Sequence, residues 1–283
     1  MSLPRAAVLR GSAWIARLGR LPLLHQFGAG WRYNTGASVA GVLLERVPGA
    51  SIADVLRTRV FESLGMADTG FYVPGDKIHR FTTFYAPDLE TGELVVLDRP
   101  EGWWSTPPKM PDAAGGLVST VDDVWKVASI LAADGGDLLS AESVRLMTLD
   151  RMTASERAEN SMFVGDHSGW GLMMAVPAGD GSTGVPGGFG WDGGSGTTWR
   201  TDRAAGLTGI LLTQWMVTSP LPSQIVTDFW CTSYAVIDRR DSQGRRDPYP
   251  AIAMSVAHAN AGITSSPKRR IMAAMAVKSP REA

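Results

Sequence analysis

Apolar residues recur at the spacing of an amphipathic helix in several stretches of the first half of the chain. The pattern predicts helices over residues 39–47, 52–60 and 121–131, and a shorter helix that starts near residue 140. The same spacing over residues 14–21 favours an amphipathic helix near the start. That start is also rich in arginine and poor in acids, which is typical of a transit peptide as well.

Two of these helices begin with the spacing of a capping box. Ser51 stands three residues before Asp54, and Thr120 stands three residues before Asp123. In such a box the first hydroxyl accepts a hydrogen bond from the backbone N–H three residues later. We therefore expect a helix to begin at each of these two points.

The second half changes to short segments that are typical of strands. Strands are predicted over residues 169–176, 196–202 and 207–214, and the four residues between the last two suit a hairpin. A closing helix over residues 221–237 follows, while residues 72–115 form a long excursion with short strands. Helices followed by antiparallel strands and a closing helix indicate an α+β domain.

Charge separates the end of the chain from the rest. Residues 239–283 hold nine basic and three acidic residues, although the whole chain has a net charge of −1. Their apolar residues are small and show little period. We therefore predict one folded domain over residues 1–238 and a basic, disordered extension over residues 239–283.

Composition narrows the partners and the compartment. A net charge close to zero argues against nucleic acid as the partner. Cys231 is the single cysteine, so no disulfide can form within the chain. No apolar run approaches the 18 residues of a membrane-spanning helix, and we expect no transmembrane segment and a cytoplasmic location.

Four short segments carry a resemblance to a known family. Residues 31–35 read Trp-Arg-Tyr-Asn-Thr, and residues 189–197 read Phe-Gly-Trp-Asp-Gly-Gly-Ser-Gly-Thr. Residues 61–69 contain Leu-Gly-Met, and residues 114–123 read as a glycine-rich turn into a helix. Together they resemble the serine β-lactamase and penicillin-binding-protein superfamily, in its class C β-lactamase-related or carboxylesterase-like branch. The resemblance implies a β-lactamase/transpeptidase-like antiparallel sheet flanked by helices.

The resemblance also implies roles for five residues. Tyr33 takes the place of the catalytic tyrosine, and Asn34 follows it as a substrate-binding residue. Trp191, Gly193 and Gly194 take the place of the strand that positions the substrate and shapes the oxyanion hole. Trp191 stands where a lysine would pair with a β-lactam carboxylate, which favours a small-molecule ester substrate. Neither a cofactor nor a metal is implied.

The nucleophile of the family is missing from these residues. The family carries it in a Ser-x-x-Lys motif ahead of the tyrosine, and no lysine precedes Lys77 here. Ser265 and Lys268 have that spacing, but they stand in the basic tail with Pro267 between them. We therefore expect a chain truncated at its N-terminus, without the nucleophile helix and the first strands of the sheet.

Two functions stay open at this point. The first is an esterase-like serine hydrolase that acts through an acyl-enzyme in the complete family member and is inactive in this chain as written. The second is a non-catalytic pseudoenzyme or interaction module that keeps the scaffold. Without the first strands, the apolar strand over residues 207–214 would form an open sheet edge, and we expect self-association through it.

Overall fold

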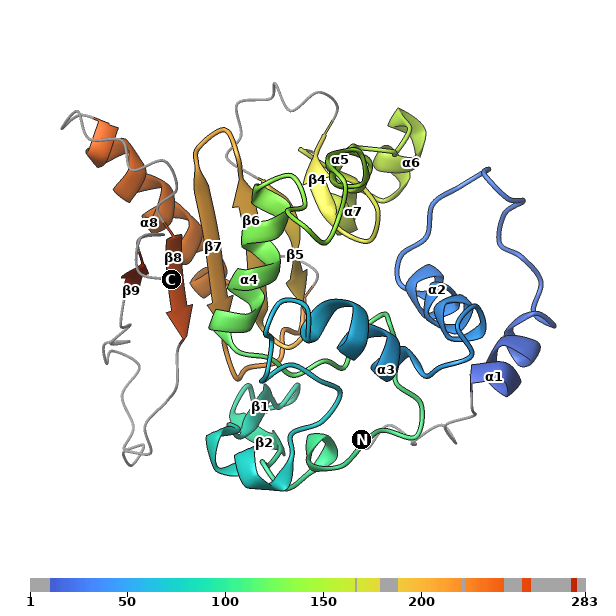
Figure 1. Ribbon diagram of the computed structural model, residues 1–283. Coiled ribbons are helices and arrows are strands. Elements are labelled where there is room, and N and C mark those ends of the chain that lie inside the picture. The colour runs from blue at the N-terminus through green and yellow to red at the C-terminus, as the bar shows by residue number, and fades with distance from the viewer. Residues whose placement is uncertain are drawn as a thin grey trace. The chain divides into compact units, whose positions relative to one another are not determined.

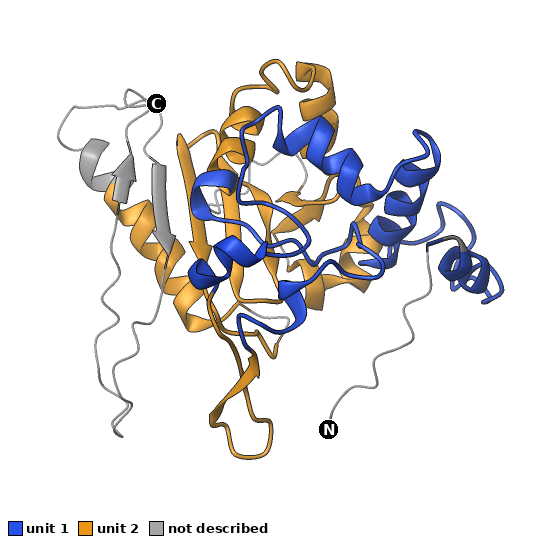
Figure 2. Cartoon of the chain, turned by 60° about the horizontal axis from the view of Figure 1, so that its bottom comes forward, with its two compact units in different colours: residues 1–81, 99–123 blue, residues 82–98, 124–283 orange. Residues whose placement is uncertain are grey.

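The structure is a computed structural model, and it describes residues 11–165, 167–178, 188–219, 222–241, 251–255 and 276–278. The chain divides into two compact units (Figure 2). Unit 1 comprises residues 1–81 and 99–123, and unit 2 comprises residues 82–98 and 124–283.

Unit 1 is built from short helices. They are α1 (Gly11–Leu18), α2 (Thr35–Arg46), α3 (Ile52–Leu56), a π-helical turn (Arg57–Phe61) and two 3-10 turns (Gly75–Arg80 and Trp103–Ser105). The hydroxyl of Ser51 accepts a hydrogen bond from the N–H of Asp54 at 3.1 Å, so the cap predicted for α3 is confirmed. Buried apolar residues of unit 1 include Val42, Ile52 and Phe61.

A seven-stranded sheet forms the centre of unit 2, in the order β3-β4-β5-β6-β7-β8-β9 (Figure 1). Neighbouring strands run antiparallel except for β7 and β8, which are parallel. The strands are β3 (Ser168–Trp170), β4 (Ala175–Pro177), β5 (Phe189–Gly193), β6 (Thr197–Asp202), β7 (Leu207–Leu212), β8 (Ala251–Ser255) and β9 (Ala276–Lys278).

Apart from the sheet, unit 2 contains helices and one small hairpin. The helices are α4 (Val121–Ala132), α5 (Ala141–Thr148), α6 (Ala154–Glu159), α7 (Ser161–Val164) and α8 (Gln224–Asp241), and the division between the units falls within α4. The hairpin pairs β1 (Phe84–Pro87) with β2 (Leu94–Asp98). The hydroxyl of Thr120 accepts from the N–H of Asp123 at 3.3 Å, as the capping spacing predicts.

Apolar side chains hold helices against the sheet through two clusters. Leu131 of α4 and Val144 of α5 share one cluster with Phe189 of β5. Val226 and Phe229 of α8 share the other with Leu207 and Leu211 of β7. Burial of such side chains is the main favourable term in folding, so these clusters fix the sheet that carries β5.

One predicted strand is wrong in its extent. The segment over residues 169–176 is not a single strand, because it reverses between β3 and β4. Met173 adopts a left-handed conformation with φ 64°, and the N–H of Gly171 donates to the carbonyl of Met174 at 2.9 Å. A local turn therefore replaces the middle of the expected strand.

The expectation of an open edge at β7 is also wrong. Leu207 to Leu212 pair with β6 on one side, and Thr208 to Leu212 pair with β8 on the other. β8 and β9 come from the segment that the sequence assigns to a basic, disordered extension. Where that segment is described it contains these strands and the end of α8, and the rest of that prediction lies outside the described residues.

Within the described part of the chain, no helix combines the length and the apolar character that crossing a membrane requires.

Candidate functional site

Tyr33 lies in a tight turn directly before α2. The N–H of Thr35 donates to the carbonyl of Tyr33 at 3.3 Å, and Asn34 between them has φ 84° and ψ −66°. These values describe a γ-turn with positive φ, which is rare and strained for a residue other than glycine. Strained backbone of this kind clusters at functional sites in proteins. The Tyr33 side chain is 37% exposed, so its phenol lies at the surface of unit 1.

The glycine-rich turn after residue 111 packs on the first turns of α2. Ser38 Oγ donates to Asp112 Oδ2 at 3.1 Å, and Asp112 Oδ1 accepts from the N–H of Ala114 at 2.9 Å. A Cβ on Gly41 would lie 2.8 Å from the Cβ of Ala113, so only glycine allows this approach. The turn that leads into residues 114–123 is therefore joined to α2, the helix that Tyr33 precedes.

The second predicted segment forms the hairpin between β5 and β6. The N–H of Gly196 donates to the carbonyl of Gly193 at 3.0 Å, and Gly196 has φ 74°. A turn followed by a left-handed glycine is a common three-residue hairpin loop. A Cβ on Gly196 would lie 2.0 Å from the carbonyl oxygen of Trp215, so this position requires glycine on two grounds.

Gly194 directly follows β5 in the hairpin turn. Its carbonyl accepts from the N–H of Val217 at 3.0 Å. Among the described residues, no oxygen accepts a hydrogen bond from the N–H of Gly194. A Cβ on Gly194 would meet no heavy atom within 4 Å, so the space around this residue is open. Gly194 is also an exposed residue.

On the edge of β5 away from β6, β4 pairs with β5 at one position in the described structure, Ala175 with Gly190. Because the two strands are antiparallel, the residues of β5 after Gly190 lie opposite the residues that precede β4. Backbone N–H and C=O groups alternate in direction along a strand. Gly193 uses its carbonyl in the turn toward β6, so the backbone groups of Asp192 point to the edge on which no residue of β4 pairs with it.

Trp191 and Asp192 of β5 point to opposite faces of the sheet, and each side chain contacts neighbouring side chains. The ring of Trp191 packs edge-on against Trp170 at 4.7 Å between centroids. The carboxylate of Asp192 accepts from Thr198 Oγ1 at 2.5 Å and pairs with Arg200 at 2.6 Å. Trp191 is thus held by packing against another aromatic ring, and the carboxylate of Asp192 is held by Thr198 and Arg200.

The five residues predicted from the sequence fall in different units. Tyr33 and Asn34 belong to unit 1, and Trp191, Gly193 and Gly194 belong to unit 2. The structure brings the first two together in one turn and the other three together in one hairpin.

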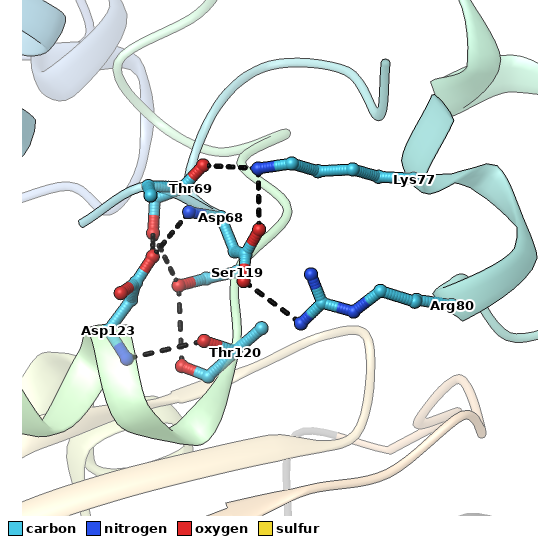
Figure 3. A network of polar contacts seen from close by, with 8 residues as sticks. Asp68, Thr69, Lys77, Arg80, Ser119, Thr120 and Asp123 are labelled. Atoms are coloured by element: carbon cyan, nitrogen blue, oxygen red, sulfur yellow. Dashed lines mark hydrogen bonds and ion pairs between the residues drawn. The ribbon is translucent and has the colours of Figure 1, made fainter. Parts of the chain in front are cut away.

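A polar network in unit 1 was not predicted from the sequence (Figure 3). Asp123 Oδ2 accepts from the N–H of Asp68 at 2.8 Å and from Thr69 Oγ1 at 2.9 Å. Asp68 in turn forms ion pairs with Lys77 at 2.7 Å and Arg80 at 2.9 Å. Arg80 first and Lys77 second lower the pKa of Asp68 to about 2. Asp68 and Asp123 lie 55 positions apart in the sequence. The one feature of the sequence that could have pointed to this network is that both acids belong to segments of the family resemblance.

This network forms part of the wall of a cavity of about 440 Å³ that lies within unit 1. Asp68, Lys77 and Arg80 line it, together with Phe61, Phe71 and further apolar residues. Neither Tyr33 nor Asn34 is among its lining residues.

Comparison with known proteins places these features in a family. The family described as Beta-lactamase matches residues 3–224. The chain belongs to this family. An uncharacterised protein of Mycobacterium tuberculosis is 37% identical over 217 residues, which cover 71% of this chain and 53% of that protein. Esterase EstB of Burkholderia gladioli is 29% identical over 218 residues, which cover 70% of this chain and 53% of the esterase.

The fold agrees with the family. Simvastatin synthase LovD from Aspergillus terreus, in a mutant form, aligns with a TM-score of 0.65 at 19% identity, over 82% of this chain and 61% of that one. The α+β class and the β-lactamase/transpeptidase-like architecture predicted from the sequence are thereby confirmed. The chain spans about half the length of the curated relatives that it matches.

Proposed function

We propose that this chain provides the tyrosine and the oxyanion-binding strand of an esterase-like acyl-transfer site. The observation that carries the proposal is the N–H of Gly194, which has no acceptor among the described residues and belongs to an exposed residue. A fixed, unused backbone donor is what a developing oxyanion needs, because it stabilises charge without reorganisation. The carbonyl of Gly193 accepts from the N–H of Gly196 at 3.0 Å, so the peptide unit that carries the Gly194 N–H is already oriented.

Tyr33 is the proton carrier in this proposal. When a nucleophilic hydroxyl attacks the ester carbon, a new C–O bond forms, Tyr33 accepts the hydroxyl proton, and the carbonyl oxygen becomes an anion beside Gly194. When the alcohol leaves, its C–O bond breaks and Tyr33 returns the proton to it. Water then repeats the sequence on the acyl group. A phenol has a pKa near 10, so this role requires a cation close to Tyr33.

The substrate class follows from Trp191. An indole packed against Trp170 offers an apolar wall and no positive charge for a β-lactam carboxylate. Small uncharged esters fit such a wall better than carboxylate-bearing antibiotics. The names of two relatives, Esterase EstB and the lovastatin esterase of Penicillium rubens, agree with ester chemistry.

The nucleophile comes from outside the described residues in this proposal. The 32 residues before Tyr33 contain no lysine, so they cannot hold a Ser-x-x-Lys motif. The same observation favours a second candidate, a non-catalytic scaffold whose open β5 edge binds another molecule without turning it over.

Complementation separates these two functions. An N-terminal fusion that carries a Ser-x-x-Lys helix from an active family member is expected to hydrolyse p-nitrophenyl butyrate. The matched Tyr33→Phe fusion is expected to lose at least about 100-fold in kcat, as the loss of a general base does. A folded fusion with no turnover favours the scaffold, and a Tyr33→Phe fusion with full turnover contradicts the role of Tyr33.

A further inference from the structure

The cavity of unit 1 has the size and the walls of a small-molecule site. Its volume of about 440 Å³ falls in the range of ligand pockets in proteins. Four aromatic residues line it, Phe61, Phe71, Tyr72 and Phe81, together with three prolines of one loop, Pro107, Pro108 and Pro111. These walls have little conformational freedom to lose, so they are suited to an apolar ligand body.

The acids of this cavity are already engaged by neighbouring side chains. Both oxygens of Asp68 are used, one by Lys77 and the other by Arg80. Both oxygens of Asp54 are used as well, one by Ser51 and the other by Arg57. A ligand that offers hydrogen-bond donors would therefore compete with bonds that already exist.

The cations, in contrast, keep unused donors. Lys77 has three N–H donors. It uses two of them, one to the carbonyl of Ala67 and one to Asp68. Arg80 has five N–H donors, and Asp68 is its one ion-pair partner in the described structure. The lining residues also carry one more positive than negative charge, with Arg57, Lys77 and Arg80 against Asp54 and Asp68.

We propose that this cavity binds an organic carboxylate whose body is aromatic or branched aliphatic. The body lies among the phenylalanine and proline side chains, and the carboxylate accepts from the free donors of Lys77 and Arg80. Because an anion next to Asp68 shares its two cations, the ligand adds to an existing network instead of breaking it (Figure 3). This site is separate from the proposed acyl-transfer function, and neither Tyr33 nor Gly194 contributes to it.

Calorimetric titration of the full 283-residue chain with 4-phenylbutyrate tests this site. The matched probe is 4-phenylbutyramide, which keeps the body and removes the charge. We expect the acid to bind with at least about tenfold higher affinity than the amide, the discrimination that one charge-assisted hydrogen bond provides. Equal affinities, or no binding of the acid to the folded chain, would overturn the proposal.

Two variants locate the binding. Arg80→Gln removes the cation and leaves Lys77 to pair with Asp68, so it should weaken the acid about five- to tenfold and leave the amide unchanged. Ala53→Phe fills the cavity from α3 and should abolish binding of both probes. Arg145→Gln, on an exposed ion pair of α5, is the control and should bind like the parent chain.

Circular dichroism melting confirms that each variant is folded before titration. Unchanged binding of 4-phenylbutyrate by folded Arg80→Gln and Ala53→Phe would place the ligand elsewhere and overturn the assignment. These results do not depend on turnover, so they stand apart from the test of the acyl-transfer site.

Discussion

Each of the two units is stabilised internally by a different kind of interaction. In unit 1, segments far apart in the sequence are joined by side-chain hydrogen bonds, from Asp123 to residues 68 and 69 and from Ser38 to Asp112. In unit 2, apolar clusters join helices to both faces of the sheet. Stability that comes from such hydrogen bonds and ion pairs depends on charge and pH. Stability that comes from apolar clusters depends on the volume of the buried side chains. The proposed proton carrier Tyr33 thus sits in the charge-sensitive unit, and the proposed oxyanion donor Gly194 in the volume-sensitive one.

The largest effect is expected from a cavity in unit 2. Leu211 is fully buried between β7 and α8, so Leu211→Ala removes packed methyl groups and should lower the free energy of unfolding by about 3–5 kcal/mol. Leu43→Ala on α2 is the matched control, because Leu43 is 61% exposed, and it should change stability by less than about 0.5 kcal/mol. Urea unfolding followed by circular dichroism measures both. Similar losses in the two variants would contradict the burial argument.

The central acid of unit 1 should come next. Asp123 is buried, and Asp123→Ala leaves the N–H of Asp68 and the hydroxyl of Thr69 without their acceptor. We expect a loss of about 2–3 kcal/mol in the same urea experiment, which is the cost of buried donors left unsatisfied. Asp122→Ala changes the adjacent, exposed carboxylate and controls for the helix terminus. If both variants lost the same stability, the network would not be what joins these segments.

A smaller, pH-dependent effect is expected at Asp68. Because folding lowers the pKa of Asp68 from 3.8 to about 2, its ion pairs stabilise the fold above pH 3.8. This contribution is lost as the pH falls toward 2. At pH 7, Asp68→Asn should be less stable than the parent by at most about 1 kcal/mol, since Lys77 and Arg80 are partly exposed. The difference in the free energy of unfolding between the parent and Asp68→Asn should be smaller at pH 2.5 than at pH 7, and the same difference at both pH values would exclude this origin.

The smallest effect on stability is expected at Tyr33. Tyr33→Phe removes a hydroxyl from a partly exposed ring and should change the free energy of unfolding by less than about 0.5 kcal/mol. The same change should remove turnover in the complemented chain. Tyr33→Phe would then affect the reaction without affecting stability. A large loss of stability in Tyr33→Phe would instead mark the hydroxyl as structural.

Local features were predictable from the sequence, and non-local ones were not. The caps at Ser51 and Thr120 and the hairpin between β6 and β7 depend on residues within a few positions, and all three are confirmed. The turn at Met173 was missed because a methionine in left-handed conformation has no signature in the sequence. The pairing of β7 with β8 was missed because it joins residues more than 40 positions apart in the sequence, and no local pattern indicates such a pairing.

The site shows the same division. The family resemblance pointed to Tyr33 and to the hairpin at Gly194, and the sequence could not show that Asn34 forms a strained γ-turn or that the Gly194 N–H is unused. The network of Asp68 and Asp123 depends on two segments that meet only in the folded chain. Its discovery required the structure.

Intact-mass spectrometry of the purified 283-residue chain after treatment with a serine-reactive fluorophosphonate tests the central claim most directly, with p-nitrophenyl butyrate turnover measured on the same sample. The account predicts a folded chain with no adduct and no turnover, because residues 1–32 hold no Ser-x-x-Lys motif that could supply the nucleophile of the proposed function. A stoichiometric adduct together with turnover would show that one of its own serines is the nucleophile, and would contradict the account.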